Sequence, residues 1–324
     1  MSRRRLLLLS GLLVAAGLTL AAQGHLRGLP SIDGAVLAHN RETTARRQAE
    51  LHATGVYGLD PDGWTPLAPA REGEWLYHHP EEGQTFEEFV DFDPLRRAPG
   101  RERVVLQPLT PLRPHAEAAL EVVREQCGLF FAAEAALAPP LELPPAAFDA
   151  ARGQWDSAHL LDWLAARRPE GALVYAGVAD EDFFVRGLDN YVFGLGRFRE
   201  GLGVYSYRRF HHPGVDERLY LARAFKLLTH EVGHGFGLKH CVYFRCVMNG
   251  SNALPELDGS PLEPCPVCLR KLQHSLGFDV RARWAALAGL YERLGLADDA
   301  AWLRARLARL EQDGRAAPWA DPPG

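Results

Sequence analysis

Residues 227–248 read LLTHEVGHGFGLKHCVYFRCVM and concentrate metal-binding side chains in one short stretch. Between positions 230 and 248 the stretch holds three histidines, two cysteines and a glutamate, and it ends on one of the two methionines in the chain. His230 and His234 are four residues apart, so a helix would place both imidazoles on one face, one turn apart. This spacing predicts that the two histidines bind a single zinc ion.

The pattern continues beyond these two histidines as H-E-x-x-H-x-x-G-x-x-H. Gly237 predicts the end of the helix, because glycine tolerates the left-handed conformation in which helices commonly terminate. His240 follows three residues later and can turn back as a third ligand. Glu231 is next to His230 in the sequence, so its side chain does not point at the metal ion as those of the two histidines do. It is therefore not expected to be a third ligand and is free to act on a water molecule. Three protein ligands leave a coordination position open for water, which indicates a catalytic zinc, because structural sites are usually closed by four ligands.

The helix that carries the histidines is predicted to begin near Asp216, and it has one apolar face. Its apolar residues follow steps of four, three and four along Leu221, Phe225, Leu228 and Val232, as in a helix packed on a sheet. Strands are predicted at residues 103–109, 129–137, 171–178, 190–196 and 203–210, and helices at 114–127 and 157–168. This order indicates an α/β fold in which helices pack on a mixed sheet. The sequence contains no G-x-S-x-G motif, which argues against a serine esterase.

Four of the five cysteines fall within 28 residues, at Cys241, Cys246, Cys265 and Cys268. The last two form a C-x-x-C pair inside PCPVCLRKL. This spacing suits a tetrahedral four-thiolate zinc better than a bridge across two residues. Two disulfides are the alternative in an exported protein. We therefore expect a structural zinc that joins the loop after His240 to the next helix, with Cys127 left as a buried thiol.

The first 23 residues have the layout of a secretory signal or a membrane anchor. Three arginines precede 17 uncharged, mostly apolar residues at positions 6–22, which is close to the lower length limit for a membrane-spanning helix. We expect an exported or membrane-anchored protein in a periplasmic or other extracytoplasmic compartment. Ser2, Arg3 and Arg4 followed by leucines also resemble a twin-arginine export signal.

The rest of the chain divides into four segments. Residues 24–100 are rich in Pro, Gly, His and charge, and they predict a loosely ordered extension or pro-region in which only EEGQTFEEFV (81–90) looks ordered. Residues 101–277 form the predicted zinc domain. Residues 278–313 predict a helical hairpin packed on that domain, with partner binding as the alternative, because Trp284, Leu287 and Tyr291 have the spacing that opens a tetratricopeptide repeat. Residues 314–324 form a polar, proline-rich tail.

Composition and charge place the chain among ordinary globular proteins. It is 47% apolar and 24% charged, with a formal net charge of −5. An acidic chain has no positive field to gather nucleic acid, so we expect no nucleic-acid partner.

The longer pattern H-E-x-x-H-x-x-G-x-x-H-C, four residues, C-x-M and then C-x-x-C closely resembles the archaemetzincins, a branch of the metzincin zinc peptidases. The resemblance continues more weakly through AFDAARGQWDS, DEDFF, NYVFGLG and SYRRF, and EGQTFEEF is similar to a segment upstream in longer members. It implies a metzincin-like mixed twisted sheet with an active-site helix. It also implies that Met248 forms the methionine turn beneath the catalytic zinc, and that an edge strand around residues 191–196 pairs with an extended substrate.

These patterns together predict an exported zinc peptidase with two zinc ions, one catalytic and one structural. His230, His234 and His240 would hold the catalytic zinc, which would lower the pKa of a bound water to about 7. Glu231 would act as the general base. The alternative is a non-catalytic zinc-binding module that binds a protein. Glu231 favours the enzyme, because metal binding alone needs the ligands but not the base. The sequence leaves open whether the substrate is cleaved internally or from one end.

Overall fold

The main sheet of the computed structural model is built on two buried parallel strands, β1 (Arg103–Thr110) and β6 (Ala172–Ala179). All eight residues of β6 are buried, and their sequence ALVYAGVA is continuously apolar. Such runs are typical of parallel strands that have both faces covered. The structure describes residues 34–53, 63–187 and 191–312.

The main sheet has six strands in the described part of the chain, in the order β2, β1, β6, β10 and β9, with β3 beside β1. All neighbours are parallel except β9, which is antiparallel to β10 and forms one edge. The added strands are β2 (Ala135–Leu137), β3 (Leu141–Glu142), β9 (Gly194–Arg197) and β10 (Leu202–Ser206). The predicted mixed sheet is therefore confirmed. The edge position of β9 agrees with the expected edge strand, whose pairing with substrate stays a prediction.

A second sheet of four short strands was not predicted from the sequence. Its strands, in sheet order, are β4 (Phe148–Asp149), β5 (Gln154–Asp156), β7 (Phe183–Phe184) and β8 (Tyr191–Val192). Segments of two or three residues are too short to show the alternation that identifies a strand. The strand expected at 190–196 therefore divides after Val192, since β8 belongs to this sheet and β9 to the main one.

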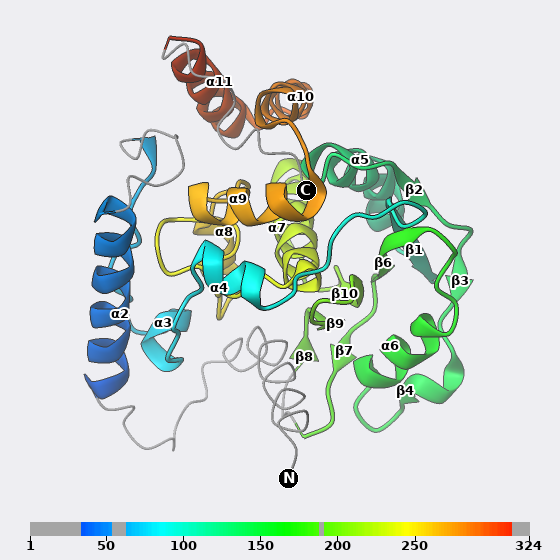
Figure 1. Cartoon of the computed structure of the whole chain (residues 1–324). Helices are drawn as coiled ribbons and strands as arrows, with labels where there is room; N and C mark the ends of the chain where they lie inside the picture. Colours follow the sequence, from blue (N-terminus) through cyan, green and yellow to red (C-terminus); the bar gives the residue numbers. More distant parts are fainter. Residues whose placement is uncertain (1–33, 54–62, 188–190, 313–324) are drawn as a thin grey trace.

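Alternate residues of β1 enter two different apolar cores, because successive side chains of a strand point to opposite faces. Val104 and Leu106 lie in the core that includes residues of helices α5 (Pro114–Phe130) and α7 (Glu217–Phe236). Val105 and Leu109 lie in the core that includes residues of α6 (Ser157–Ala165). The main sheet is thus covered on both faces, and α7 lies at the centre of the molecule (Figure 1).

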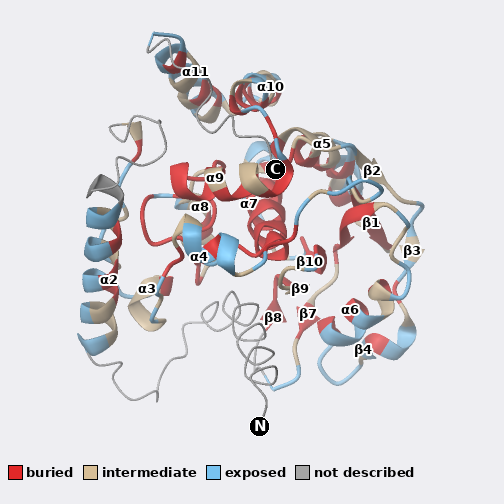
Figure 2. Cartoon of the chain, in the orientation of Figure 1, coloured by how far each residue is buried: buried red, intermediate tan, exposed pale blue. Residues whose placement is uncertain are grey.

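Helix α7 agrees with its prediction at both ends. The Asp216 side chain accepts a hydrogen bond of 2.8 Å from the Leu219 amide and caps the N-terminus. Gly237 ends the helix with φ 102°, in the left-handed region. The predicted stripe of Leu221, Phe225, Leu228 and Val232 is buried. Figure 2 shows that burial continues along almost all of α7 to its C-terminus.

Two predicted boundaries near Gly128 were wrong. Helix α5 continues through Gly128 to Phe130, so the strand expected at 129–137 is confined to β2. The aromatic side chains explain the difference, because Phe130 and Phe131 are both buried in the core. The chain turns instead at Ala132, which has φ 45°. Apolar packing therefore decides where this helix ends.

The loosely ordered extension expected at residues 24–100 differs from the structure. The described residues form helices α2 (Gly34–Ala53), α3 (Trp75–His78) and α4 (Phe86–Asp91), and α3 and α4 lie between α2 and α7 (Figure 1). The Asn40 side chain of α2 donates to the carbonyls of Leu76 and His79. Polar contacts of this kind produce no apolar period, which explains the wrong expectation.

The order expected for residues 81–90 is confirmed. Thr85 and Glu88 form a capping box at the start of α4, in which each side chain accepts a hydrogen bond from the other residue's amide. Arg47 of α2 donates to the Glu88 carboxylate at 2.9 Å and so joins the two helices. A role for this region as a pro-region stays a prediction.

Both ends of the chain fall outside the described residues. The predicted signal or anchor at 1–23 and the tail at 314–324 belong to these ends. Among the residues that the structure describes, no helix is long and apolar enough to cross a membrane.

The C-terminal hairpin packs on the rest of the protein through a buried ion pair. After α8 (Leu254–Gly259) and α9 (Pro266–Leu276), Gly277 ends α9 with φ 68°, and α10 (Val280–Arg293) and α11 (Ala297–Gln312) follow. Arg283 donates to Glu263 at 2.7 Å and to the Phe130 carbonyl.

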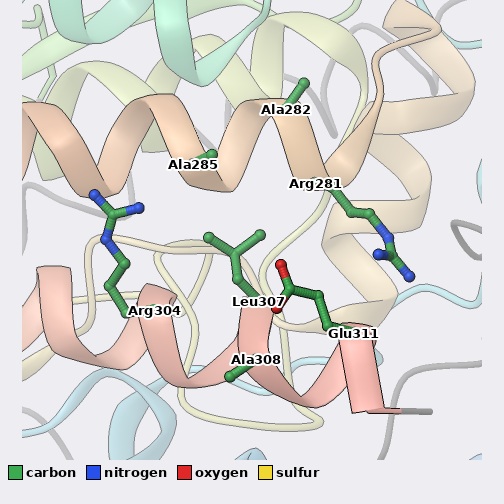
Figure 3. A pocket seen from close by; sticks show the side chains of 7 residues that line it. All are labelled: Arg281, Ala282, Ala285, Arg304, Leu307, Ala308 and Glu311. Atoms are coloured by element: carbon green, nitrogen blue, oxygen red, sulfur yellow. The ribbon is translucent and has the colours of Figure 1, made fainter. Parts of the chain in front are cut away.

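Residues of α10 and α11 line an open groove between the two helices of this hairpin. The groove has a volume of about 470 Å³ and shares no residue with the histidine and cysteine clusters. Figure 3 shows the Leu307 side chain of α11 pointing toward α10, the helix that carries Ala285. Partner binding by the hairpin stays a prediction.

Candidate metal centres

Three buried imidazoles meet at the C-terminal end of α7. His230 and His234 lie one turn apart in the helix, and His240 follows the left-handed residue Gly237. One ring nitrogen from each lies within 4.8 Å of the others, and the Nε2 atoms of His230 and His234 are 3.0 Å apart. Tetrahedral zinc with Zn–N bonds of 2.0–2.1 Å would place its nitrogens about 3.3 Å apart. The three histidines therefore fit one zinc ion.

The two helical histidines are oriented by main-chain carbonyls. His230 Nδ1 lies 2.8 Å from the Val247 carbonyl oxygen, and His234 Nδ1 lies 2.6 Å from that of Leu238. A carbonyl oxygen can only accept, so both Nδ1 atoms carry the proton. Each Nε2 then presents a lone pair to the shared site.

The third histidine is oriented by a carboxylate that sequence reasoning missed. His240 Nδ1 lies 2.6 Å from Glu81 Oε1, and the two residues are 159 positions apart. The Nε2 atom of His240 is buried and has no hydrogen-bond partner among the residues that the structure describes. An unpartnered buried ring nitrogen is costly unless a ligand takes it, which is a second sign of a metal site. Glu81 opens the one N-terminal stretch that looked ordered in the sequence, but nothing in that stretch indicated its contact with His240.

The pKa values of the three histidines do not all shift in the same direction. Burial lowers the pKa of His230 to about 3 and that of His234 well below its ordinary value. Both are therefore held in the neutral form that binds metals. Burial also lowers the pKa of His240, but the charge and hydrogen bond of Glu81 outweigh it, and the pKa is raised overall.

Glu231 and Met248 both lie against the histidine cluster. Glu231 follows His230 in α7 and is 4% exposed, and burial raises the pKa of its carboxyl to about 7 although His240 acts in the opposite direction. Met248 is packed against Gly233, where a β-carbon would lie 2.5 Å from the methionine Sδ. Gly233 precedes His234, so the thioether contacts the turn of helix between the two histidines.

The four predicted cysteines form a second cluster. Their Sγ atoms lie within 4.8 Å of one another, and those of Cys241 and Cys265 are 3.5 Å apart. Tetrahedral zinc with Zn–S bonds of 2.3 Å would place sulfurs about 3.8 Å apart. The backbone amides of Met248 and Cys265 also donate to Cys246 Sγ. The structure describes all four cysteines, and Cys127, as free and buried, so neither of the two disulfides considered as the alternative is formed in it.

The chain matches known proteins along much of its length. The profile of Peptidase family M54 matches residues 154–274, which include both clusters. Archaemetzincin-2 from Homo sapiens is 30% identical over 267 residues, spanning 70% of this chain and 74% of that protein. Archaemetzincin from Methanopyrus kandleri is 41% identical over 135 residues, spanning 42% of this chain and 75% of that protein.

A solved structure is also similar. The crystal structure of archaemetzincin from Methanopyrus kandleri is 32% identical, covers 55% of this chain and 97% of its own, and superposes with a TM-score of 0.49. The family profile includes residues on both sides of the histidine cluster, and the match to Archaemetzincin-2 spans most of both chains. The chain therefore belongs to the archaemetzincins, peptidase family M54, and is a zinc metallopeptidase that acts on peptides or proteins.

Proposed function

We propose that His230, His234 and His240 hold the catalytic zinc and that Glu231 is the general base of peptide hydrolysis. One observation carries this proposal. One ring nitrogen from each histidine lies within 4.8 Å of the others, while each Nδ1 atom is hydrogen-bonded to a separate acceptor. This arrangement leaves lone pairs directed at a common centre. Three ligands also leave a coordination position for water.

Bound zinc supplies Lewis-acid polarisation of the scissile carbonyl and acidifies a water molecule. Glu231 would accept a proton from the attacking water and would pass it to the leaving amine. The position of Glu231 next to His230 on α7 supports this role. The outer hydrogen bonds keep the imidazoles fixed throughout, so the ligands do not have to reorganise as charge develops on the substrate.

The direct test replaces Glu231 with glutamine in the zinc-loaded protein. Glu231→Gln keeps the size and hydrogen bonding of the side chain but cannot accept the proton. We expect zinc content to stay near the wild-type value while turnover of peptides, read by mass spectrometry on a diverse library, falls by about 100-fold or more. His234→Ala is the matched control, since it should lose zinc from the histidine site as well as activity.

Undiminished hydrolysis by Glu231→Gln would show that the base lies elsewhere. If the wild-type protein binds zinc in the histidine site but cleaves no library peptide, the result would favour the non-catalytic binding module, which the family assignment does not favour.

We also propose that Met248 forms the methionine turn that supports the zinc ligands. The support for this is the close contact of its Sδ with Gly233. Gly233→Ala should therefore displace the methionine and destabilise the metal-loaded protein by about 1–3 kcal/mol in urea unfolding. Gly289 of α10 is the control, because a β-carbon there meets nothing within 4 Å. Gly289→Ala should be neutral or stabilising by up to about 1 kcal/mol. Equal stability of Gly233→Ala and wild type would contradict the packing role.

We propose that a second, structural zinc is bound by Cys241, Cys246, Cys265 and Cys268. Four converging free thiols support it. Protein purified without chelator should contain two zinc ions per chain. Cys265→Ser should contain one and melt at a lower temperature, because structural zinc contributes folding energy directly. Cys127→Ala, outside the cluster, should keep both ions. One zinc in wild type, with disulfides among the four cysteines, would rule out the second site.

We propose, finally, that the chain is exported through its first 23 residues. The three arginines followed by 17 uncharged residues support this. In a bacterial host, fractionation should place the full-length protein outside the cytoplasm. Replacing Arg3 and Arg4 with lysine should retain it inside if the twin-arginine route is used, whereas Arg5→Lys should not. Wild-type protein confined to the cytoplasm would contradict export, and export of the double lysine variant would exclude that route alone.

A further inference from the structure

The hydrogen-bond acceptors of the three zinc-binding histidines come from different parts of the chain. The acceptors for His230 and His234 are carbonyls within 17 residues of their histidines. The acceptor for His240 is the Glu81 side chain, 159 residues earlier. The third ligand is therefore the one whose orientation depends on the N-terminal segment.

We propose that Glu81 is a positioning residue for His240, and that residues 75–85 are a permanent part of the metal centre. This inference rests on the proposed function of the histidine site. A carboxylate that accepts the Nδ1 proton fixes the tautomer and the ring orientation of a zinc-binding histidine, and it increases the basicity of Nε2. Within the described part of the chain, the buried Nε2 atom of His240 has no hydrogen-bond partner and is available to a metal ion, as this role requires.

Glu81 is itself held in place by its neighbours. Its Oε1 also accepts a hydrogen bond of 2.9 Å from Trp75 Nε1, and its backbone amide donates to Asn40 Oδ1 at 2.9 Å. The Trp75 ring meets the His240 ring edge-on, with 5.0 Å between ring centroids. The Trp75 amide donates to Glu256, beyond the methionine turn. Helices α2 and α3 thus set the position of the carboxylate.

A second contact joins the same segment to the loop between the ligands. The buried Gln84 side chain donates to the Gly237 carbonyl at 3.2 Å and accepts from the Lys239 amide at 3.2 Å. Lys271 of α9 donates to Gln84 Oε1 at 3.1 Å. Gly237 and Lys239 precede His240, so Gln84 fixes the path by which the third ligand returns to the site.

The contacts also distinguish this role from that of an inhibitory pro-segment that ligates the metal. Such a segment would have to reach the Nε2 side of the rings, where the shared site lies. Glu81 binds on the Nδ1 side of His240, which faces away from that site. The carboxylate therefore orients the ligand and does not occupy the metal position.

The experiment measures metal binding in the full chain for Glu81→Gln and Glu81→Ala. Zinc affinity of the histidine site is obtained by competition with a chromophoric chelator, and Co²⁺ absorption reports its coordination separately from that of the thiolate site. We expect Glu81→Ala to weaken zinc binding by about 10- to 100-fold and to change the cobalt spectrum. Glu81→Gln keeps an acceptor without the charge, so its affinity should fall between those of alanine and wild type. Glu87→Gln, an exposed carboxylate on α4, should match wild type.

Wild-type affinity and an unchanged cobalt spectrum in both Glu81 variants would overturn the proposal. If Glu81→Ala fails to fold, the Glu81→Gln variant is decisive. A zinc affinity below that of wild type supports the positioning role. A zinc affinity equal to that of wild type means that Glu81 contributes only to packing and overturns the proposal. If the histidines of the wild-type protein bind neither zinc nor cobalt, the proposed function fails together with this inference. If they bind both metals and the Glu81 variants bind them equally well, only the inference about Glu81 fails.

Discussion

Three buried imidazoles meet at the C-terminal end of α7, and each must keep one ring nitrogen directed at the shared site. Each ring has a second nitrogen, and a buried Nδ1 needs its own hydrogen-bond acceptor. The acceptors approach from three directions: the carbonyl of Val247, the carbonyl of Leu238 and the carboxylate of Glu81. The loop after α7, the turn at Met248 and the N-terminal segment are therefore all fixed by the same need to orient the rings.

Each of these three hydrogen-bond acceptors is held in position by a different part of the structure. The Leu238 carbonyl follows the left-handed residue Gly237, which ends α7. The Val247 carbonyl lies between Cys246 and Met248, so the cysteine cluster that ties this loop to α9 also sets its position. The Glu81 carboxylate depends on α2 and α3. A substitution in the cysteine cluster or in the N-terminal helices should therefore change the orientation of a zinc-binding imidazole, although none of the three histidines is itself replaced.

The parts that could be predicted from the sequence are those encoded locally. The apolar steps of α7, its start near Asp216 and its end at Gly237 each depend on a few neighbouring residues, and the structure has all three. The convergence of the histidines and of the cysteines followed from motif spacing alone. The end of α5 was missed because it depends on how Phe130 and Phe131 pack, and the second sheet because its strands are too short to show a period. Glu81 and Gln84 were missed because their partners lie more than 150 residues away.

The most direct test of the central claim is a crystal structure of protein purified without chelator, with anomalous diffraction recorded at the zinc absorption edge. We expect an anomalous peak about 2.0–2.1 Å from Nε2 of His230, His234 and His240. Glu81 should contact His240 Nδ1 on the far side of that ring. A fully ordered histidine cluster without a peak, or a zinc ion bound through Nδ1 of His240 in place of Glu81, would contradict it.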